Sequence, residues 1–164
     1  MQLARWSALA FLSILLIACS GSSKVRKPAD LVNVTNQVEL AEVWSTSVGS
    51  SVPANFRPVV ASDHVFAASA RGTLSKLNIQ NGRVVWEVSV PEKLSIGPGS
   101  DGKTTVVIST EGNVYAYDET GKNIWKTPIG SEVLSDPIVA AGVVVIRTLD
   151  NRFIGLDAAN GKRR

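Results

Sequence analysis

Cysteine and histidine are nearly absent from this chain, because Cys19 and His64 are the only residues of their kind. A single cysteine excludes a disulfide within one chain. A zinc site made of several histidines and cysteines is excluded for the same reason. His64 has no second histidine to act with, so we expect it to have a structural or surface position. We predict no metal site and no catalytic residues, and a folded part that is stabilised by its packed core.

Long apolar runs are also missing. The apolar stretch near the start, residues 8–18, has eleven residues and no charge, whereas a helix that spans a bilayer needs about 20. This stretch follows Arg5, and a short basic head before an apolar core of this length is typical of a secretory signal peptide. We therefore predict a signal peptide over residues 1–18.

The residue after this stretch is Cys19. The sequence Leu16-Ile17-Ala18-Cys19 resembles the lipobox of bacterial lipoproteins. This resemblance implies that Cys19 is acylated, with palmitate among its chains, and becomes the new N-terminus. Several acyl chains anchor a protein stably, where a single chain does not. The alternative is a conventional cleavage site with Cys19 as an ordinary residue. Residue 20 is Ser. The lack of Asp after the cysteine resembles the pattern of lipoproteins that are sorted to the outer rather than the inner membrane.

The charge of the chain is low and evenly spread. Without residues 1–18 the chain keeps 16 of its 17 basic residues, against 14 acidic ones. A nucleic-acid-binding protein would need a concentrated basic face, so we predict no nucleic-acid partner. Residues 19–36 are rich in Ser, Lys, Pro and Asn, which is typical of a flexible tether.

The remainder of the chain repeats itself at a nearly fixed interval. Glycine recurs at positions 72 and 112, and tryptophan at positions 86 and 125. A second glycine series recurs at positions 82, 121 and 161. The interval is about 40 residues in each case, and a fixed period of this length indicates a repeat architecture.

Each repeat has the features of paired β-strands. Alternating apolar residues lead into a turn with Asp or Asn at its start and Gly at its end, as in Asp118 to Gly121, and a second run ends in Trp. Four short strands in about 40 residues are typical of a β-propeller blade, whereas helical repeats need a helical periodicity that is missing here. We predict an all-β propeller of four-stranded antiparallel blades. Asp118 and Asp157 are equivalent positions, and we expect shared turn chemistry rather than a catalytic carboxylate pair.

The repeats divide the folded part, residues 37–164, into four segments. We predict a latch strand at 37–50, repeat 1 at 56–90, repeat 2 at 96–129 and a truncated repeat 3 at 134–164. A propeller ring closes with about four blades or more, so about two complete blades and part of a third predict an N-terminal fragment. The positions that we expect to carry the repeat structurally are Trp44, Gly72, Gly82, Trp86, Gly112, Asp118, Gly121, Trp125, Asp157 and Gly161.

Several runs resemble the BamB family of outer-membrane lipoproteins. They are Trp44 to Gly49 after the lipobox, Asp118 to Trp125, Leu134 to Val139 and Leu149 to Asn151. The resemblance implies an eight-bladed propeller that faces the periplasm from the outer membrane and has no catalytic activity or cofactor. It also implies binding to BamA within the BAM complex, and a role in inserting unfolded β-barrel proteins into the outer membrane. The family's BamA contacts lie mainly in later blades, so we carry no contact residue over to this chain.

Two other functions remain open from the sequence. The repeat is shared with dehydrogenases that hold pyrroloquinoline quinone (PQQ) and calcium in a propeller, so the chain could belong to a PQQ-dependent periplasmic dehydrogenase. It could also belong to a propeller lipoprotein that binds another envelope partner.

Overall fold

The computed structural model describes residues 28–30, 40–50, 56–133 and 135–164. The chain divides into two compact units, residues 1–40 and 41–164. The predicted signal peptide, Cys19 and most of the predicted tether lie outside the described residues, and residues 28–30 are exposed without regular structure. No helix long and apolar enough to cross a membrane occurs in the described part of the chain.

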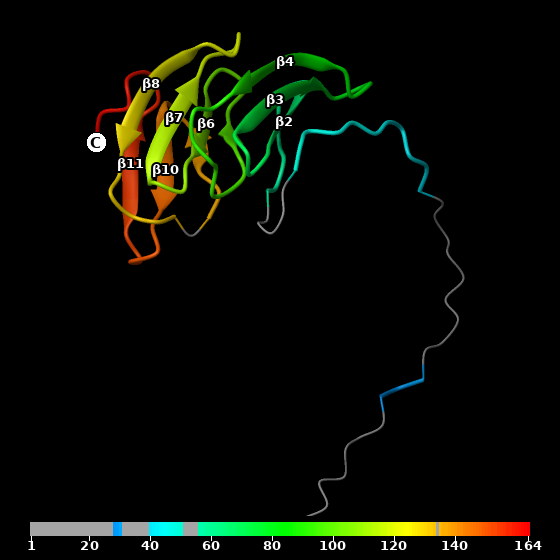
Figure 1. Ribbon diagram of the computed structural model, residues 1–164, viewed down its shortest axis with the longest axis horizontal. Helices are drawn as coiled ribbons and strands as arrows, with labels where there is room; N and C mark the ends of the chain where they lie inside the picture. The colour runs from blue at the N-terminus through cyan, green and yellow to red at the C-terminus, as the bar shows by residue number, and fades with distance from the viewer. Residues whose placement is uncertain (1–27, 31–39, 51–55, 134) are drawn as a thin grey trace, which may run out of the picture. The chain divides into compact units, whose positions relative to one another are not determined.

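The second unit contains eleven described strands in three antiparallel sheets, which we call sheets 1, 2 and 3 (Figure 1). In each sheet, strands that follow one another in the chain are neighbours. Sheet 1 consists of β1 (Val59–Ala61), β2 (His64–Ala68), β3 (Thr73–Asn78) and β4 (Val84–Ser89). Sheet 2 consists of β5 (Gly99–Ser100), β6 (Thr105–Ile108), β7 (Asn113–Tyr117) and β8 (Asn123–Pro128). Sheet 3 consists of β9 (Ile138–Ala140), β10 (Val143–Arg147) and β11 (Phe153–Asp157). These meanders are propeller blades and confirm the predicted fold class.

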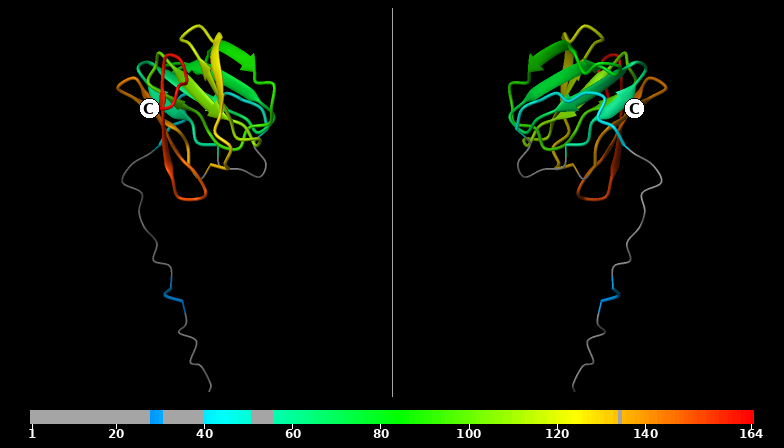
Figure 2. Two further views of the ribbon diagram at one scale, coloured as in Figure 1. Left: turned by 90° about the vertical axis from the view of Figure 1, so that its left-hand side faces the viewer. Right: turned by 90° about the vertical axis from the view of Figure 1, so that its right-hand side faces the viewer.

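The sheets lie side by side in chain order, so sheet 2 is covered on both faces (Figures 1 and 2). All four residues of β6 are buried, and the strand reads as an unbroken apolar run after Thr105 because neither face meets water. One buried cluster joins sheets 1 and 2, with Ala68, Leu74, Val90, Leu94, Val107, Tyr115 and Tyr117. The other joins sheets 2 and 3 and includes Val106, Val114, Trp125, Val144, Ile146, Ile154 and Leu156.

The outermost strands of sheets 1 and 2 each contain a bulge immediately before the tryptophan. Lys76 pairs with Trp86 and Leu77 with Val84, so Val85 is the extra residue. Ala116 pairs with Trp125 and Tyr117 with Asn123, so Ile124 is the extra residue. A bulge twists its strand and redirects the next side chain, and here that side chain is the tryptophan.

The turns that precede these outer strands differ in length. Backbone hydrogen bonds close a six-residue turn from Asn78 to Arg83 and another from Asp157 to Lys162. The turn in sheet 2 closes between Asp118 and Lys122 and is one residue shorter. The turns begin 40 and then 39 residues apart, at Asn78, Asp118 and Asp157. Because the turn of sheet 2 is one residue shorter, the order is reversed for the turn glycines, whose intervals are 39 and then 40 residues.

The outward face of sheet 3 exposes large apolar side chains. Phe153 is 72% exposed, whereas its neighbour Ile154 is 8% exposed and packs on sheet 2. In sheet 2, the residue equivalent to Phe153 is Val114, and it is fully buried against sheet 3. Because the faces correspond, the exposed face of sheet 3 has the character of a surface between blades.

Candidate functional site

The feature that recurs in this structure is a contact between a tryptophan and the turn of the next sheet, which we call the docking contact. Trp86 Nε1 donates a hydrogen bond of 3.0 Å to the carbonyl oxygen of Glu119. Trp125 Nε1 donates one of 2.9 Å to the carbonyl oxygen of Ala158. The indole rings lie against the turn glycines, where an added Cβ would come within 3.0 Å of Trp86 at Gly121. Each contact therefore joins two neighbouring blades through one aromatic ring.

Trp44 makes the same contact with sheet 1. Its Nε1 donates a hydrogen bond of 2.8 Å to the carbonyl oxygen of Ile79, and a Cβ on Gly82 would lie 2.4 Å from the ring. Thr46 adds a bond of 2.8 Å to the carbonyl oxygen of Gly82. Residues 40–50 are not assigned to a strand, because a strand requires ladder hydrogen bonds and these two side-chain bonds supply none. Trp44 thus occupies the place of an outer-strand tryptophan, while closure of a ring by residues 37–50 remains a prediction.

The docking contact between sheets 1 and 2 has no threonine hydroxyl to support it. Thr127 Oγ1 bonds the carbonyl oxygen of Gly161 at 2.9 Å, as Thr46 does at Gly82. The position two residues after Trp86 is Val88, which packs against the core. The contact of Trp86 therefore lacks one hydrogen bond that the other two contacts have.

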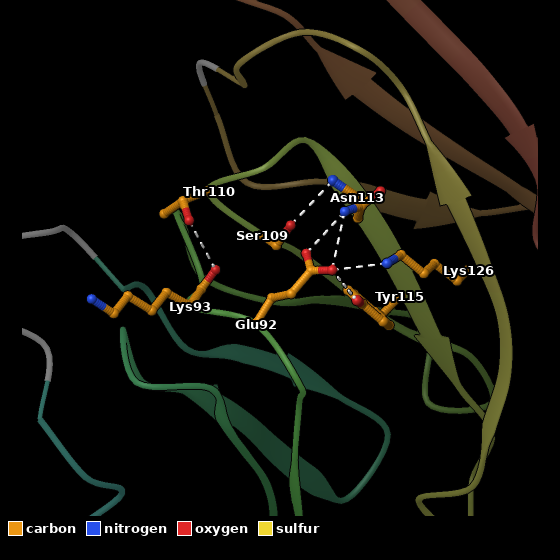
Figure 3. A network of polar contacts seen from close by, with 7 residues as sticks. All are labelled: Glu92, Lys93, Ser109, Thr110, Asn113, Tyr115 and Lys126. Carbon is orange, nitrogen blue, oxygen red and sulfur yellow. Dashed lines mark hydrogen bonds and ion pairs between the residues drawn. The ribbon is translucent and has the colours of Figure 1, made fainter.

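A carboxylate cluster ties the connection between sheets 1 and 2 to sheet 2 (Figure 3). Glu92 lies in the connection between β4 and β5 and accepts hydrogen bonds from three side chains of β7 and β8. Asn113 Nδ2 reaches both carboxylate oxygens at 3.1 and 2.9 Å, Tyr115 Oη lies at 2.6 Å and Lys126 Nζ at 2.8 Å. Glu92 is 15% exposed, and Lys126 is 46% exposed. The ion pair is therefore partly shielded from water and ties the connection to sheet 2.

The cluster holds its groups in fixed charge states. Partial burial opposes ionisation of Glu92, but hydrogen bonds from Lys126, Tyr115 and other neighbours outweigh it and lower the pKa to about 2. The hydrogen bond to Glu92 raises the pKa of Lys126. Burial and the adjacent carboxylate raise the pKa of Tyr115. A carboxylate whose oxygens already accept hydrogen bonds from three side chains, and whose pKa is lowered to about 2, is a poor general base at neutral pH. This arrangement is therefore suited to holding the connection in place.

A buried lysine also lies between sheets 1 and 2. Lys76 is 7% exposed, and its Nζ donates a bond of 3.3 Å to the same Glu119 carbonyl that accepts from Trp86. The ammonium group lies 5.6 Å from the centre of the Phe66 ring, which is within the range of a cation–π interaction. Ala116 holds the equivalent position in sheet 2, so this polar contact is particular to sheet 1.

A repeated backbone hydrogen bond joins the turn between the second and third strands of sheets 1 and 2, and the last turn of sheet 3, to the connection that precedes each sheet. The backbone nitrogens of Ala70, Thr110 and Leu149 donate to the carbonyl oxygens of Ser50, Lys93 and Glu132, at 3.2, 2.9 and 2.9 Å. Gly72 and Gly112 lie in the first two of these turns with positive φ angles of 99° and 75°. These two glycines are therefore turn residues without a phosphate-binding context.

Asp118 and Asp157 each accept hydrogen bonds within their own turns. Asp118 Oδ1 accepts from the hydroxyl and the backbone nitrogen of Thr120 and from the backbone nitrogen of Lys122. Asp157 Oδ1 accepts from the backbone nitrogen of Ala159. The Thr120 hydroxyl is the main cause of the lowered pKa of Asp118, and a bond from Arg164 is the main cause of the lowered pKa of Asp157. Each aspartate orders its own turn.

The single histidine begins β2 and pairs with Asn78. Its ring centre lies 6.5 Å from that of Phe66. No group of three or more potential metal ligands occurs among the described residues.

Sequence reasoning did not identify Glu92, Lys76 or the threonines that support docking. Glu92 lies outside the repeated pattern, and its partners Asn113, Tyr115 and Lys126 fall in two different strands. The threonines had a signal, because Thr46 and Thr127 each lie two residues after a repeat tryptophan.

Three comparisons place this architecture among known proteins. A family model described as "Outer membrane protein assembly factor BamB" matches residues 29–96 and 70–164. The protein of that name from Bordetella pertussis is 38% identical over 154 residues, which cover 90% of this chain and 40% of the relative.

The solved structure of BamB from Moraxella catarrhalis superposes with a TM-score of 0.59 at 22% identity, over 66% of this chain and 33% of that one. A quinohemoprotein alcohol dehydrogenase from Pseudomonas putida superposes at 0.63 with 18% identity, over 74% of this chain and 21% of that one. Both likenesses concern the fold alone.

The repeated blades and the docking contact define a β-propeller built from PQQ-like repeats. Within that class, the chain belongs to the BamB family. The curated relatives carry the name of an assembly factor, which agrees with the prediction that the chain is not an enzyme. The chain spans 40% of the length of the Bordetella relative.

Proposed function

We propose that this chain is the N-terminal part of a lipid-anchored scaffold that assists the assembly of outer-membrane proteins. The observation that carries the proposal is the docking contact repeated at Trp44, Trp86 and Trp125, in a chain 38% identical to a curated assembly factor. A propeller joined in this way offers a rigid frame that displays loops and blade edges to partners.

The proposal includes an anchor at the N-terminus. In it, residues 1–18 are removed as a signal peptide, and Cys19 is acylated and holds the propeller at the outer membrane, facing the periplasm. Residues 20–36 then act as the tether. The support is the lipobox-like sequence before Cys19, and the energetic reason is that two or more acyl chains hold a protein at a membrane stably.

The proposed partners are BamA and the BAM complex, with unfolded outer-membrane proteins as clients. This part rests on the name of the curated relatives and on the family to which the chain belongs. Residues 37–50 are proposed as the latch that closes the ring of the whole protein. The contact of Trp44 with Gly82 supports this role, because it gives the segment the position of an outer strand.

Affinity purification from solubilised outer membranes tests the partner. The tagged protein should recover the barrel-inserting subunit, and a folded bait that recovers none would contradict the assembly role. The variant Cys19→Ala should lose membrane association and the acylated N-terminal peptide seen by mass spectrometry. An unmodified Cys19 in membrane-bound wild-type protein would refute the anchor and leave the partner question intact.

A second assay separates the scaffold from the dehydrogenase alternative. The purified protein is supplied with PQQ and calcium, and dye-linked oxidation of alcohols or sugars is followed. Activity would favour the quinone enzyme, and the scaffold proposal expects none. The likeness to the alcohol dehydrogenase concerns the fold alone at 18% identity, so it does not favour that function.

A further inference from the structure

The two six-residue turns each carry an asparagine immediately before the docking glycine. The pairs are Asn81-Gly82 and Asn160-Gly161, and both asparagines are exposed while both glycines are buried. The five-residue turn of sheet 2 has Thr120 before Gly121. Both longer turns therefore contain an Asn-Gly dipeptide, which is chemically labile, and the shorter turn does not.

An Asn-Gly pair can react with itself in water. The glycine nitrogen attacks the side-chain carbonyl carbon of the asparagine, a nitrogen–carbon bond forms, and ammonia leaves. Water then opens the resulting succinimide at either carbonyl, which gives aspartate or isoaspartate. Glycine favours the reaction because no side chain shields its nitrogen and its backbone is conformationally free.

The native turns hold the reacting groups in other bonds. Gly82 N–H donates to the carbonyl oxygen of Asn78 at 2.9 Å, and Asn81 Oδ1 accepts from Arg83 N–H at 3.0 Å. The second turn repeats this arrangement, with Gly161 N–H donating to Asp157 at 2.8 Å and Asn160 Oδ1 accepting from Lys162 at 3.0 Å. Cyclisation requires both bonds of a turn to break, so it requires the turn to open.

The docked tryptophan determines how often each turn opens. A Cβ on Gly82 would lie 2.4 Å from Trp44, and one on Gly161 would lie 2.6 Å from Trp125, so each ring covers its glycine. Trp125 belongs to β8, has a strand partner and is 8% exposed. Trp44 is more exposed and lies in a segment that is not assigned to a strand. Segments with fewer backbone and packing contacts open more readily, so the turn under Trp44 opens more often.

We propose that Asn81 is a site of spontaneous deamidation that is gated by the docking of Trp44. Asn160 has the same chemistry and is protected by Trp125. Isoaspartate at position 81 adds a methylene group to the main chain and a negative charge beside the docking glycine. The altered turn no longer fits under the indole, so the reaction loosens residues 41–50 irreversibly. This consequence goes beyond the scaffold function and does not depend on it.

Peptide mapping by mass spectrometry tests the proposal. The folded protein is incubated at mildly alkaline pH, and conversion at each asparagine is compared with that in synthetic peptides covering residues 76–86 and 155–164. Asn81 is expected to convert about tenfold or more faster than Asn160 in the folded protein, because the rates follow the local opening equilibria. Both peptides should convert faster than the folded protein. A faster reaction at Asn160, or equal rates at Asn81 in protein and peptide, would overturn the proposal.

Variants test the gate itself. Trp44→Ala should bring the rate at Asn81 close to that of the peptide and leave the rate at Asn160 unchanged, with circular dichroism to verify folding. Thr46→Val removes only the hydroxyl that bonds Gly82, and should raise the rate at Asn81 by a smaller factor. The variant Asn81→Gln removes the reacting asparagine and should show no conversion at position 81. If neither Trp44→Ala nor Thr46→Val changes the rate at Asn81, the gating is refuted.

Discussion

Trp125 and Gly161 are joined so closely that the glycine has no room for a side chain. A Cβ at position 161 would lie 2.6 Å from the indole and 2.5 Å from Thr127 Oγ1, at a φ of +70°. Gly142 has nearly the same φ, +73°, but nothing within 4 Å of the added Cβ. A side chain at Gly142 would be opposed by the backbone conformation alone, whereas one at Gly161 would also clash with the indole. Comparing substitutions at the two positions therefore isolates the cost of the clash.

We predict that Gly161→Ala lowers the free energy of unfolding by about 1–3 kcal/mol more than Gly142→Ala, because overpacking costs about that much. Both variants share the cost of a left-handed backbone. Urea unfolding measures the difference. Equal losses in the two variants would show that the ring moves aside easily and that the docking contact has little specificity.

The missing hydroxyl between sheets 1 and 2 predicts a stabilising substitution. Val88→Thr supplies the group that Thr46 and Thr127 use toward their turns. The new hydroxyl is expected to donate a hydrogen bond to the carbonyl oxygen of Gly121 and to raise the free energy of unfolding by about 0.5–1.5 kcal/mol.

The matched control is Thr127→Val, which removes the bond to Gly161 and should lower the free energy of unfolding by a similar amount. Thermal unfolding of both variants gives the comparison. A destabilised Val88→Thr together with an unaffected Thr127→Val would mean that the hydroxyl does not support docking.

The Glu92 cluster predicts a particular dependence of stability on pH. The folded pKa of Glu92, about 2, is below its ordinary value of 4.5. The stabilisation is therefore complete above pH 4.5 and is lost as the pH falls toward 2. Unfolding followed between pH 6 and pH 2.5 should show this loss in the wild type and a smaller loss in Glu92→Gln.

At neutral pH, Glu92→Gln should lower the free energy of unfolding by about 1.5–3 kcal/mol, the usual range for hydrogen bonds to a charged group. Glu111→Gln is the control, because Glu111 is an exposed residue of the neighbouring turn. A flat difference between wild type and Glu92→Gln across the acid range would contradict the assignment.

Lys76 predicts a contrast between two substitutions. Lys76→Met keeps the buried aliphatic stem and removes the charge, so stability should change by less than about 1.5 kcal/mol, as in other volume-conserving replacements. Lys76→Ala removes the stem beside Phe66 and Trp86 and should cost about 2–5 kcal/mol. Calorimetry distinguishes the two. Equal large losses in both variants would show that the ammonium bond to Glu119, which both variants remove, outweighs the packing of the stem.

The strands and blades could be predicted from the sequence because their signals are local. Alternating apolar runs, and a glycine and a tryptophan that return once in each repeat, require no knowledge of distant neighbours. Lys76 shows what such signals miss, since an alternating strand predicts an apolar residue there, and only a carbonyl in the next blade makes a lysine acceptable. Glu92 was missed for the same reason, because its donors are brought together by the packing of its connection on sheet 2.

The turn of sheet 2 is one residue shorter than those of sheets 1 and 3, yet Gly121 lies beneath Trp86 as Gly82 lies beneath Trp44. The change in length is absorbed inside the turn and does not reach the docked ring. Insertions and deletions of one residue at this point can therefore accumulate during evolution without disturbing the neighbouring blades. Drift in repeat length should concentrate there, while the distance from each glycine to the strand that follows it stays constrained.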